Sequence, residues 1–441
     1  MEVKPGYLQT DVGVTPEDWD IVPLGDIIDY VKGYAFQPVD YRPCGVRIIR
    51  VSDTTFDSVR NDNEIFIDSD KAKSYVRRAL KKNDLVLSTV GSKPPMYDSI
   101  VGRVVIIDSG TEGALLNQNA VLLRSKDKKS VTQTLLLNHF KTKRYSQFIE
   151  SIFRGNANQA SITLKDLFKF KLAIPKKTQE ISSIATALSD ADARISSLEQ
   201  VIAKKRDIKQ AAMQDLLIGK QRLPGFDFNK KCKQSEVGRI PEDWEVKRLG
   251  DLFEITSSKR VFQSEWKRAG IPFYRARELA VLSENGFVYN ELFITEEMYD
   301  AFKRTYGVPT IGDMLVTGVG TLGKAYVVTG DHEFYFKDGN IIWFKISGNV
   351  MPEFLRQLFL TPLIAKQISD GSAGTTVGTY TISGAQKTLI PYPSLPEQRA
   401  IATVLSDMDA ELAALEQKRD KTKAIKQGMM QELLTGRIRL T

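Results

Sequence analysis

Residues 12–26 read V-G-V-T-P-E-D-W-D-I-V-P-L-G-D, and residues 237–251 repeat the stretch as V-G-R-I-P-E-D-W-E-V-K-R-L-G-D. Downstream, I-A-T-A-L-S-D-A-D at 184–192 is matched by I-A-T-V-L-S-D-M-D at 401–409, which is 217 residues later (401 − 184). That period is too long for a solenoid repeat. The chain is therefore one domain-plus-helix module written twice, and we expect two similar surfaces related by an approximate two-fold.

The two copies share a framework but differ in the side chains between its landmarks. Trp19 matches Trp244 and Arg50 matches Arg275, while the segment from Ser92 to about Ile100 is an insertion of the first copy alone. A common scaffold with different faces is the pattern expected of two recognition domains that read different targets. A decayed duplication without functional asymmetry is the alternative.

Composition narrows the class of protein. The chain has 441 residues, 42% of them hydrophobic and 26% charged, which is ordinary for a globular protein with two or more domains. Lys and Arg number 62 against 54 Asp and Glu, a net charge of +8 that favours a polyanionic partner. Two cysteines give no disulfide framework, and no apolar run is long enough to span a membrane. We expect a soluble cytoplasmic protein without a membrane partner.

Short β-branched and aromatic runs predict a strand-rich domain in each half. A helix is predicted late in each domain, near Thr132–Phe153 and Pro352–Ser369. The fold class is therefore α+β, with two mixed α/β domains. The predicted strands are 46–51, 64–67, 84–89, 102–107 and 120–123 in the first half, and 271–275, 291–294, 313–317, 324–328 and 341–346 in the second.

A different periodicity follows each domain. Ile184, Leu188 and Ile195 in the first copy, like Ile401 and Leu405 in the second, belong to apolar stripes with steps of three and four residues. Such stripes are typical of a coiled-coil seam. We expect the two long helices to pair antiparallel and to separate the two domains; the alternative is that each helix packs only on its own domain. The predicted divisions are 1–175, 176–223, 224–392 and 393–441.

The repeat is also circular. The second helix ends near Gly436-Arg437-Ile438-Arg439-Leu440, whereas the equivalent point after the first helix, Gly219-Lys220-Gln221-Arg222-Leu223, continues into Pro224-Gly225-Phe226. Pro5-Gly6-Tyr7 near the start is similar to that continuation. The end of the chain thus leads into its beginning.

These segments together resemble the specificity (S) subunit of a type I restriction-modification system. The P-E-D-W…L-G-D openings, the D-L-L/E-L-L elements before the closing glycines and the P-E-Q helix start at 396–398 carry the resemblance, which covers nearly the whole chain. One departure is that the first helix opens with T-Q-E at 178–180, so its start is expected to be looser.

The resemblance implies two target-recognition domains that each read one half of a bipartite, asymmetric site in double-stranded DNA. It also implies that the helices fix the gap between half-sites and dock two modification subunits, which carry the adenine methyltransferase and its S-adenosylmethionine. Restriction (nuclease-translocase) subunits would complete the complex. The chain itself is then expected to hold no cofactor and to be non-catalytic.

An enzyme is a poorer interpretation of the sequence. K-P-P-M-Y at 93–97 lacks the amide of an N-P-P-Y methyltransferase motif, and G-V-G-T-L-G at 318–323 has neither a matching partner in the first copy nor a following ribose-binding acid. His139 and His332 are isolated, so no metal cluster is predicted. A coiled-coil scaffold or adaptor without sequence-specific DNA binding remains the alternative function.

Candidate DNA-contacting residues are polar or basic side chains in loops of both domains, where a solvated surface role is the competing interpretation. Arg50 and Arg275 occupy equivalent positions, so a shared structural or phosphate role suits them better than base discrimination. The candidates are Ser92, Lys93, Tyr97, Arg103, Arg154, Asn156, Asn158 and Gln159 in the first domain, and Lys259, Arg260, Arg277, Thr317, Thr321, Lys324, Ser372, Thr375, Thr376 and Tyr380 in the second.

Overall fold

A computed structural model describes residues 4–55, 57–92, 101–156, 159–227, 231–289, 292–346, 348–372 and 378–440. The chain forms two compact units: unit 1 comprises Met1–Glu199 with Gln417–Thr441, and unit 2 comprises Gln200–Glu416. The dividing points lie inside two long helices, α6 (Thr178–Leu216) and α13 (Leu395–Leu433). This division does not test the predicted boundaries near residues 175, 223 and 392.

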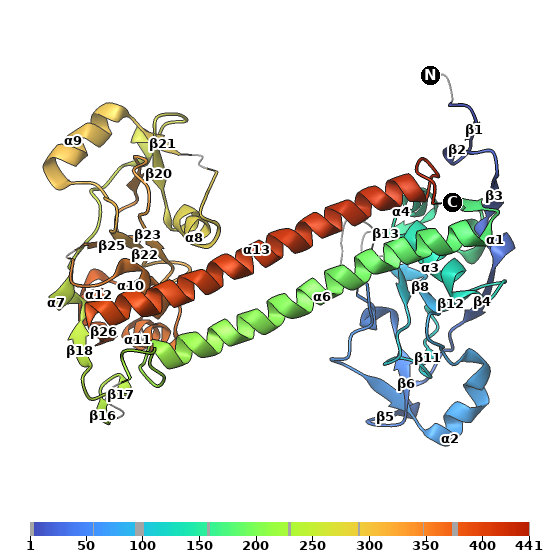
Figure 1. Cartoon of the computed structure of the whole chain (residues 1–441), viewed down its shortest axis with the longest axis horizontal. Helices are drawn as coiled ribbons and strands as arrows, with labels where there is room; N and C mark the ends of the chain where they lie inside the picture. The colour runs from blue at the N-terminus through green and yellow to red at the C-terminus, as the bar shows by residue number, and fades with distance from the viewer. Residues whose placement is uncertain are drawn as a thin grey trace. The chain divides into compact units, whose positions relative to one another are not determined.

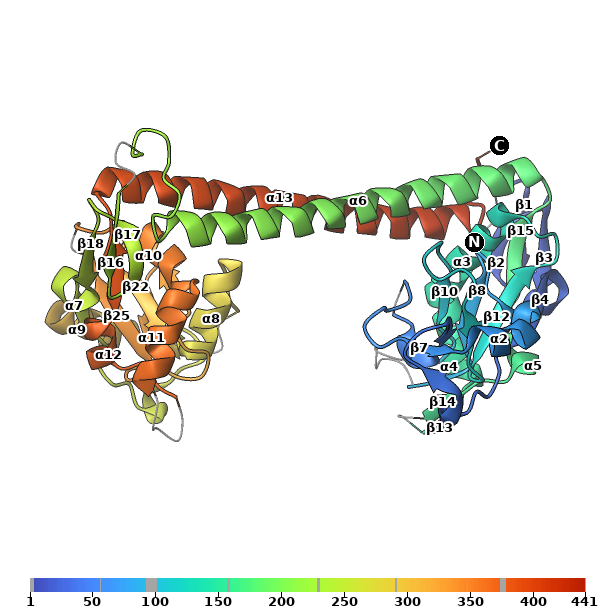
Figure 2. The same ribbon diagram turned by 90° about the horizontal axis from the view of Figure 1, so that it is seen from below.

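Unit 1 is built on a four-stranded antiparallel sheet in the order β10-β8-β12-β4, whose strands lie side by side in Figure 2; β8, β12 and β4 are also labelled in Figure 1. All four residues of β8 are buried, which explains why this strand reads as an unbroken apolar run. Unit 1 also contains a second four-stranded sheet, β11-β6-β7-β5, a small sheet, β13-β14-β9, and the strand pairs β15-β3 and β1-β2. The strands are β1 Tyr7–Thr10, β2 Gly13–Pro16, β3 Trp19–Pro23, β4 Ile28–Lys32, β5 Tyr41–Arg42, β6 Val46–Ile49, β7 Ile65–Ile67, β8 Leu85–Ser88, β9 Val90–Gly91, β10 Val104–Ile106, β11 Leu115–Leu116, β12 Ala120–Ser125, β13 Arg154–Asn156, β14 Gln159–Ser161 and β15 Lys171–Pro175.

Unit 2 repeats this plan. Its main sheet has the order β23-β22-β25-β19, in which each strand is the repeat equivalent of a strand in the unit 1 sheet, and β18-β26 corresponds to β3-β15. The predicted strands of both halves therefore have counterparts in the structure, and the mixed helix and strand content is confirmed. The strands are β16 Cys232–Ser235, β17 Gly238–Pro241, β18 Glu245–Arg248, β19 Glu254–Thr256, β20 Ile271–Tyr274, β21 Phe293–Ile294, β22 Met314–Thr317, β23 Ala325–Val327, β24 Tyr335–Phe336, β25 Ile341–Lys345 and β26 Leu389–Tyr392.

The prediction of one late helix per domain is wrong, because each forms as two helices. In unit 1, the first helix ends at Phe140 and Thr142 caps the next one, since its hydroxyl accepts the Tyr145 amide at 3.3 Å. In unit 2, Pro362 begins the second helix, where a missing amide costs nothing. The remaining helices are α1 Leu24–Ile27, α2 Ser69–Ala72, α3 Ser130–Phe140, α4 Lys143–Ile152, α5 Leu164–Leu167, α7 Leu249–Leu252, α8 Ala276–Asn285, α9 Glu296–Tyr306, α10 Pro352–Phe359, α11 Pro362–Ser372 and α12 Ile382–Lys387.

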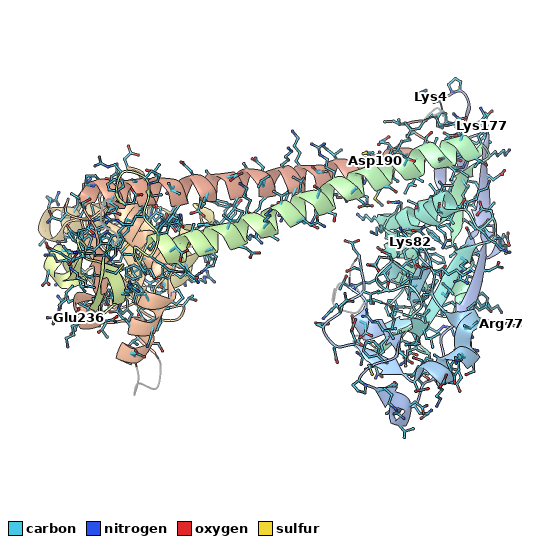
Figure 3. The ribbon with its side chains drawn as sticks, turned by 60° about the horizontal axis from the view of Figure 1, so that its bottom comes forward. Lys4, Arg77, Lys82, Lys177, Asp190 and Glu236 are labelled. Carbon is cyan, nitrogen blue, oxygen red and sulfur yellow. The ribbon has the colours of Figure 1, made fainter. Side chains whose placement is uncertain are left out.

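Within each unit, the portions of α6 and α13 run antiparallel and are linked by ion pairs. In unit 1, Asp192 pairs with Lys426 and Glu199 with Lys423, at 2.5 and 2.7 Å. The equivalent pairs in unit 2 are Asp409 with Lys209 and Glu416 with Arg206. Exposed charges such as Asp190 occupy other positions along α6 (Figure 3).

The apolar stripes of these helices also pack on the domains. In unit 1, Ile184 and Leu188 of α6 form one core with Leu433 of α13 and with Trp19 and Leu135 of the domain. Neither helix therefore packs only on its own domain, because the end of α13 shares the core of the first domain. No helix in the described part of the chain is long and apolar enough to cross a membrane.

A buried polar cluster joins the end of α13 to the start of α6 in unit 1. Glu180, 1% exposed, accepts the indole N–H of Trp19 at 3.3 Å and a guanidinium nitrogen of Arg439 at 2.8 Å. Arg439 also donates two hydrogen bonds of 2.9 Å to Asp18. We call these four residues the unit 1 clasp. The helix start at T-Q-E is thus held by hydrogen bonds from Trp19 and Arg439, and the expectation that it is looser than the second helix start stays a prediction.

The unit 2 clasp consists of Trp244, Glu397, Arg222 and Asp243, which are the repeat equivalents of the same four residues. Glu397, also 1% exposed, accepts the Trp244 indole at 3.0 Å and two Arg222 nitrogens at 2.8 and 2.7 Å. Hydrogen bonds to Glu397 raise the pKa of Arg222 above its ordinary value. The last residues of the chain thus repeat what the segment after α6 does, so the repeat is circular in structure as well as in sequence.

A glycine precedes each clasp. Gly219 and Gly436 have φ of +71° and +70°, a backbone conformation that favours glycine. A Cβ atom at Gly219 would lie 2.4 Å from the ring of Pro241, and one at Gly436 would lie 2.5 Å from the ring of Pro16. Both helices therefore end on glycine because the proline of the P-E-D-W opening packs against that point.

Candidate nucleic-acid interface

Two predicted loops of unit 1 come together in a small sheet. The strand order β13-β14-β9 joins the segment after Arg154 to the Gly91 turn, with Ala160 opposite Gly91 and Ser161 opposite Val90. The Ile162 amide adds a hydrogen bond of 3.0 Å to the Thr89 carbonyl. Residues some 70 positions apart in sequence (160 − 90) therefore share one surface, which the sequence did not predict.

Unit 2 makes the same connection with different residues. Val319 forms an antiparallel bridge with Thr379, and the Tyr380 amide donates to the Gly318 carbonyl at 2.9 Å. Thr89 and Gly318 are equivalent in the repeat, as are Ile162 and Tyr380. The framework therefore holds the corresponding pair of loops together in both units, while the residues that the loops carry differ.

The described candidates of unit 1 lie around that small sheet. Ser92 and Arg103 are half-buried at its edge, whereas Arg154 and Gln159 are exposed. Arg154 forms an ion pair of 3.1 Å with Asp166, which orients its guanidinium without removing it from solvent. The sheet thus brings four predicted candidates to one area. Lys93, Tyr97, Asn158 and the side chain of Asn156 lie outside the described residues.

In unit 2, two of the candidates are internal. Thr317 is fully buried, and its hydroxyl accepts the Lys324 amide at 3.0 Å, so it supports the turn. Tyr380 is 5% exposed, with its hydroxyl 2.9 Å from that of Thr388, and burial raises its pKa. These two side chains are not offered to a ligand in this structure.

The other unit 2 candidates near these loops are closer to the surface. Thr321 is exposed, and Lys324 pairs with Glu284 at 2.6 Å. The Ser372 hydroxyl donates to the Ser369 carbonyl at 2.9 Å. Thr375 and Thr376 lie outside the described residues.

Away from these loops, Lys259 and Lys345 of unit 2 line a cavity of about 450 Å³ at the end of β19. The Lys259 ammonium lies 4.7 Å from the centre of the Tyr306 ring, and its backbone amide donates to the Tyr335 hydroxyl at 2.8 Å. Lys345 similarly lies over Trp343, at 4.9 Å, but Trp343 is 4% exposed and Lys345 pairs with Glu254 at 2.5 Å, so these two residues support the cavity wall and Tyr306 alone is the accessible ring of the two pairs. Aromatic faces combined with cations and hydroxyls are the chemistry that contacts bases and phosphates. The sequence identified Lys259 but missed Tyr306, Trp343 and Lys345.

The two candidate arginines of unit 2 are already oriented by carboxylates. Arg260 is 69% exposed at its side chain and pairs with Asp338 at 2.9 Å, and Arg277 is 67% exposed and pairs with Glu278 at 3.0 Å. Both guanidinium groups remain accessible to a phosphate. The missed partners could have been found from the alternation of Trp343 and Lys345 along one predicted strand, because both then lie on the same face.

Arg50 and Arg275 perform one structural task in both units. The Arg50 amide donates to Asp53 at 2.9 Å and its guanidinium binds the same carboxylate at 2.7 Å. Arg275 does the same with Glu278, at 3.1 and 2.6 Å. Each arginine therefore closes the turn after the equivalent strand, which agrees with the structural side of the predicted shared role.

Comparison with known proteins adds to this geometry. Residues 16–207 and 241–426 each match the family model described as type I restriction modification DNA specificity domain. The chain belongs to this type I specificity family. A candidate MjaX type I restriction enzyme specificity subunit from Methanocaldococcus jannaschii is 26% identical over 446 residues, covering 99% of this chain and 97% of that protein. The MjaVIII specificity subunit of the same organism is 24% identical over 449 residues, covering 96% and 94%.

Solved structures of this family share the fold. The S subunit from M. genitalium covers 98% of this chain and 98% of its own, with a TM-score of 0.60 and 15% identity. At that identity the likeness concerns the fold alone. As a specificity subunit, the chain is a non-catalytic member of the family.

Proposed function

We propose that the chain recognises a bipartite, asymmetric sequence in double-stranded DNA, with each domain reading one half-site. The observation that carries this proposal is the paired framework: the same strand order and the same loop junction occur in both units, whereas the loops present different side chains. A geometry that the two domains share, carrying different polar groups, is what two domains need if they are to recognise different DNA sequences. The net charge of +8 would add sequence-independent affinity for phosphates.

The long helices would serve as the spacer and as the dock for two modification subunits. Their antiparallel pairing in each unit and their shared cores with the domains favour a stiff connection. A stiff connection between two DNA readers makes the second contact nearly intramolecular and requires a fixed gap between half-sites. The modification subunits would bring S-adenosylmethionine, and restriction subunits would complete the assembly.

A domain exchange tests this function. Residues 20–175 are replaced by the equivalent domain of a family member with a known target, and the variant is expressed with its modification subunits. Sequencing of methylated adenines in cellular DNA should show one changed half-site, with the other half-site and the gap retained because unit 2 and the helices are untouched. A change in both half-sites, or in neither, would contradict modular reading, and absence of salt-dependent DNA binding would favour the scaffold alternative.

A further inference from the structure

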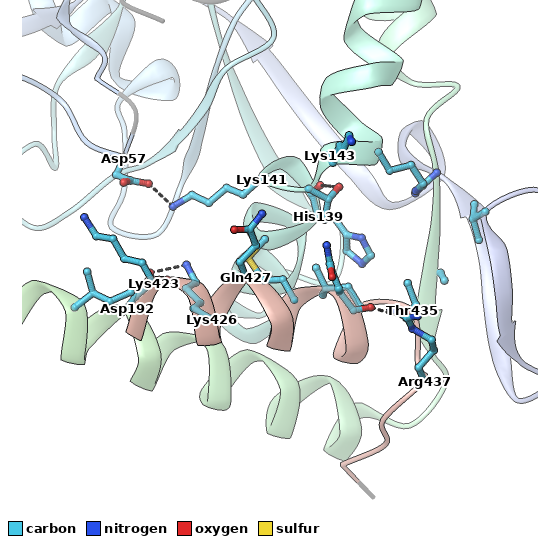
Figure 4. Close-up of a pocket in the computed structure, with 18 of the residues that line it drawn as sticks. Asp57, His139, Lys141, Lys143, Asp192, Lys423, Lys426, Gln427, Thr435 and Arg437 are labelled. Atoms are coloured by element: carbon cyan, nitrogen blue, oxygen red, sulfur yellow. Dashed lines mark hydrogen bonds and ion pairs between the residues drawn. The ribbon is translucent and has the colours of Figure 1, made fainter. Parts of the chain in front are cut away.

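Unit 1 contains a cavity of about 610 Å³ between its domain and the helix pair (Figure 4). That volume lies in the range of roughly 300–1,000 Å³ that is typical of sites for small molecules. One wall comes from the α3–α4 turn and from β15, and the other from α6 and the last three turns of α13. The cavity plays no part in the proposed reading of DNA, so the inference drawn from it is independent of that function.

The charges around the cavity do not balance. Three of its lysines have carboxylate partners: Lys141 pairs with Asp57, Lys423 with Glu199 and Lys426 with Asp192. Lys143 and Arg144 also line it, and no carboxylate among the described residues pairs with either of them. Arg144 instead donates a hydrogen bond to the Lys171 carbonyl and lies 4.4 Å over the Phe170 ring, and burial lowers its pKa, as expected for a cation without a counter-charge.

The first backbone amides of α4 and one ring nitrogen of a buried histidine at the same point have no partner among the described residues. Lys143 and Arg144 are the first residues of α4, where amides have no acceptor within the helix, and a helix amino end favours an anion. His139 lines the cavity and is 4% exposed; its ring is hydrogen-bonded to the Ala173 backbone through the other nitrogen, and its Nε2, which makes no hydrogen bond within the described residues, is left to accept one from a protonated ligand oxygen. Figure 4 shows this ring between Lys143 and Thr435.

The repeat supplies an internal comparison. The helix residues that line the cavity recur in unit 2, where Lys209 and Arg206 are the equivalents of Lys426 and Lys423. The domain residues do not recur. The unit 2 residues at the positions of His139, Lys141, Lys143 and Arg144 are Leu358, Leu360, Pro362 and Leu363. Unit 2 therefore lacks the cations, the imidazole and one helix amide, since proline has no N–H.

We propose that the cavity of unit 1 binds a small organic anion, whose phosphate or carboxylate group lies at the amino end of α4 between Lys143 and Arg144. The opposite wall carries Ile195, Met430 and Leu434 beside its ion pairs, which gives a ligand with an apolar body a small surface to contact. A DNA phosphate backbone would leave that wall without apolar contact. The ligand would touch both the domain and α13, so its binding would hold the two together in the folded state.

The test is calorimetric titration of the full chain with 1-naphthyl phosphate and 1-naphthoate, with 1-naphthol and inorganic phosphate as probes that lack the charge or the apolar body. At least one of the two naphthyl anions should bind at one site per chain. 1-Naphthol and inorganic phosphate should bind at least about tenfold more weakly than that anion. A preference between the two anions identifies the head group. Failure of both anions to bind, binding at two sites, or equal binding of 1-naphthol would overturn the proposal.

Two variants locate the site. Lys143→Ala should weaken binding about tenfold, the loss expected for one charge-assisted hydrogen bond. Lys366→Ala, an exposed lysine on the equivalent helix of unit 2, should leave binding unchanged. Equal affinity of the Lys143 variant and the unaltered chain would place the ligand elsewhere.

A spectroscopic readout does not depend on any substitution. The chain has two histidines, so ¹³C-labelled histidine gives two imidazole signals. Adding 1-naphthyl phosphate should shift the His139 signal and leave that of the exposed His332 in place. An unmoved His139 signal at saturation would show that the anion binds outside this cavity.

Discussion

The two clasps and the two surfaces beside them can be compared directly, because the repeat places equivalent residues in both units. Each clasp joins a tryptophan, a buried glutamate, an arginine and an aspartate by the same hydrogen bonds. At the neighbouring α3–α4 turn, His139 and Arg144 of unit 1 correspond to Leu358 and Leu363 of unit 2. The joint between helix and domain is thus retained while the adjacent surface has changed. A buried, fully paired charge cluster tolerates little substitution, whereas a cavity wall can exchange polar for apolar side chains without loss of the fold.

The largest expected effect comes from breaking a clasp. Glu397→Ala removes the main partner of Arg222, whose side chain is 9% exposed, and breaking a buried ion pair costs about 3–5 kcal/mol. Glu180→Ala should cost less, since the side chain of Arg439 is 23% exposed and can be hydrated. Urea unfolding, combined with hydrogen exchange at the first turns of α13 and α6, measures both losses. Equal losses, or a larger one in unit 1, would contradict the link between burial and clasp strength.

A smaller, pH-dependent effect on stability distinguishes the α3–α4 turn of unit 1 from the equivalent α10–α11 turn of unit 2. Burial lowers the pKa of His139 from 6.5 to about 3. Between these two pKa values, His139 is protonated in the unfolded chain but neutral in the folded chain. The free energy of unfolding of unit 1 should therefore decrease as pH falls from 6.5 towards 3, by about 2 kcal/mol at pH 5. His139→Leu, which copies Leu358, should remove this contribution, while substitution of the exposed His332 by Gln should not. Parallel stability–pH curves for the unaltered chain and the His139 variant would refute this prediction.

The smallest effect concerns the outer part of the unit 1 clasp. The hydrogen bond from Arg439 lowers the pKa of Asp18 below its ordinary 3.8. The stabilisation is thus present above that pH and is lost as pH falls through the lowered value. Since the Asp18 side chain is 50% exposed, Asp18→Asn should cost less than about 1 kcal/mol at neutral pH. Thermal unfolding at pH 7 and pH 3 measures it, and a loss that does not shrink at the lower pH would point to a cause other than charge.

Much of the fold could be read from local pattern. The duplication, the apolar stripes of both long helices and the predicted strands required only matching segments and periodicity, because each depends on residues close in sequence. The single late helix was predicted wrongly in both halves, since the threonine cap and the proline that divide it were overlooked. The candidate site was less accessible: Lys259 was chosen for its charge, but Tyr306 beneath it is 47 residues away (306 − 259).

The sequence by itself determined the module, its circular repeat and the family, because these lie in the order and spacing of residues. Only the tertiary structure decided that Glu180 is buried and binds both Trp19 and Arg439, and that Lys143 and Arg144 line a cavity whose carboxylates pair with other lysines. Those facts depend on contacts between segments far apart in the chain. The sequence does not show which distant groups neutralise a given charge. Burial, which sets how strongly two charges interact, exists only once the chain has folded.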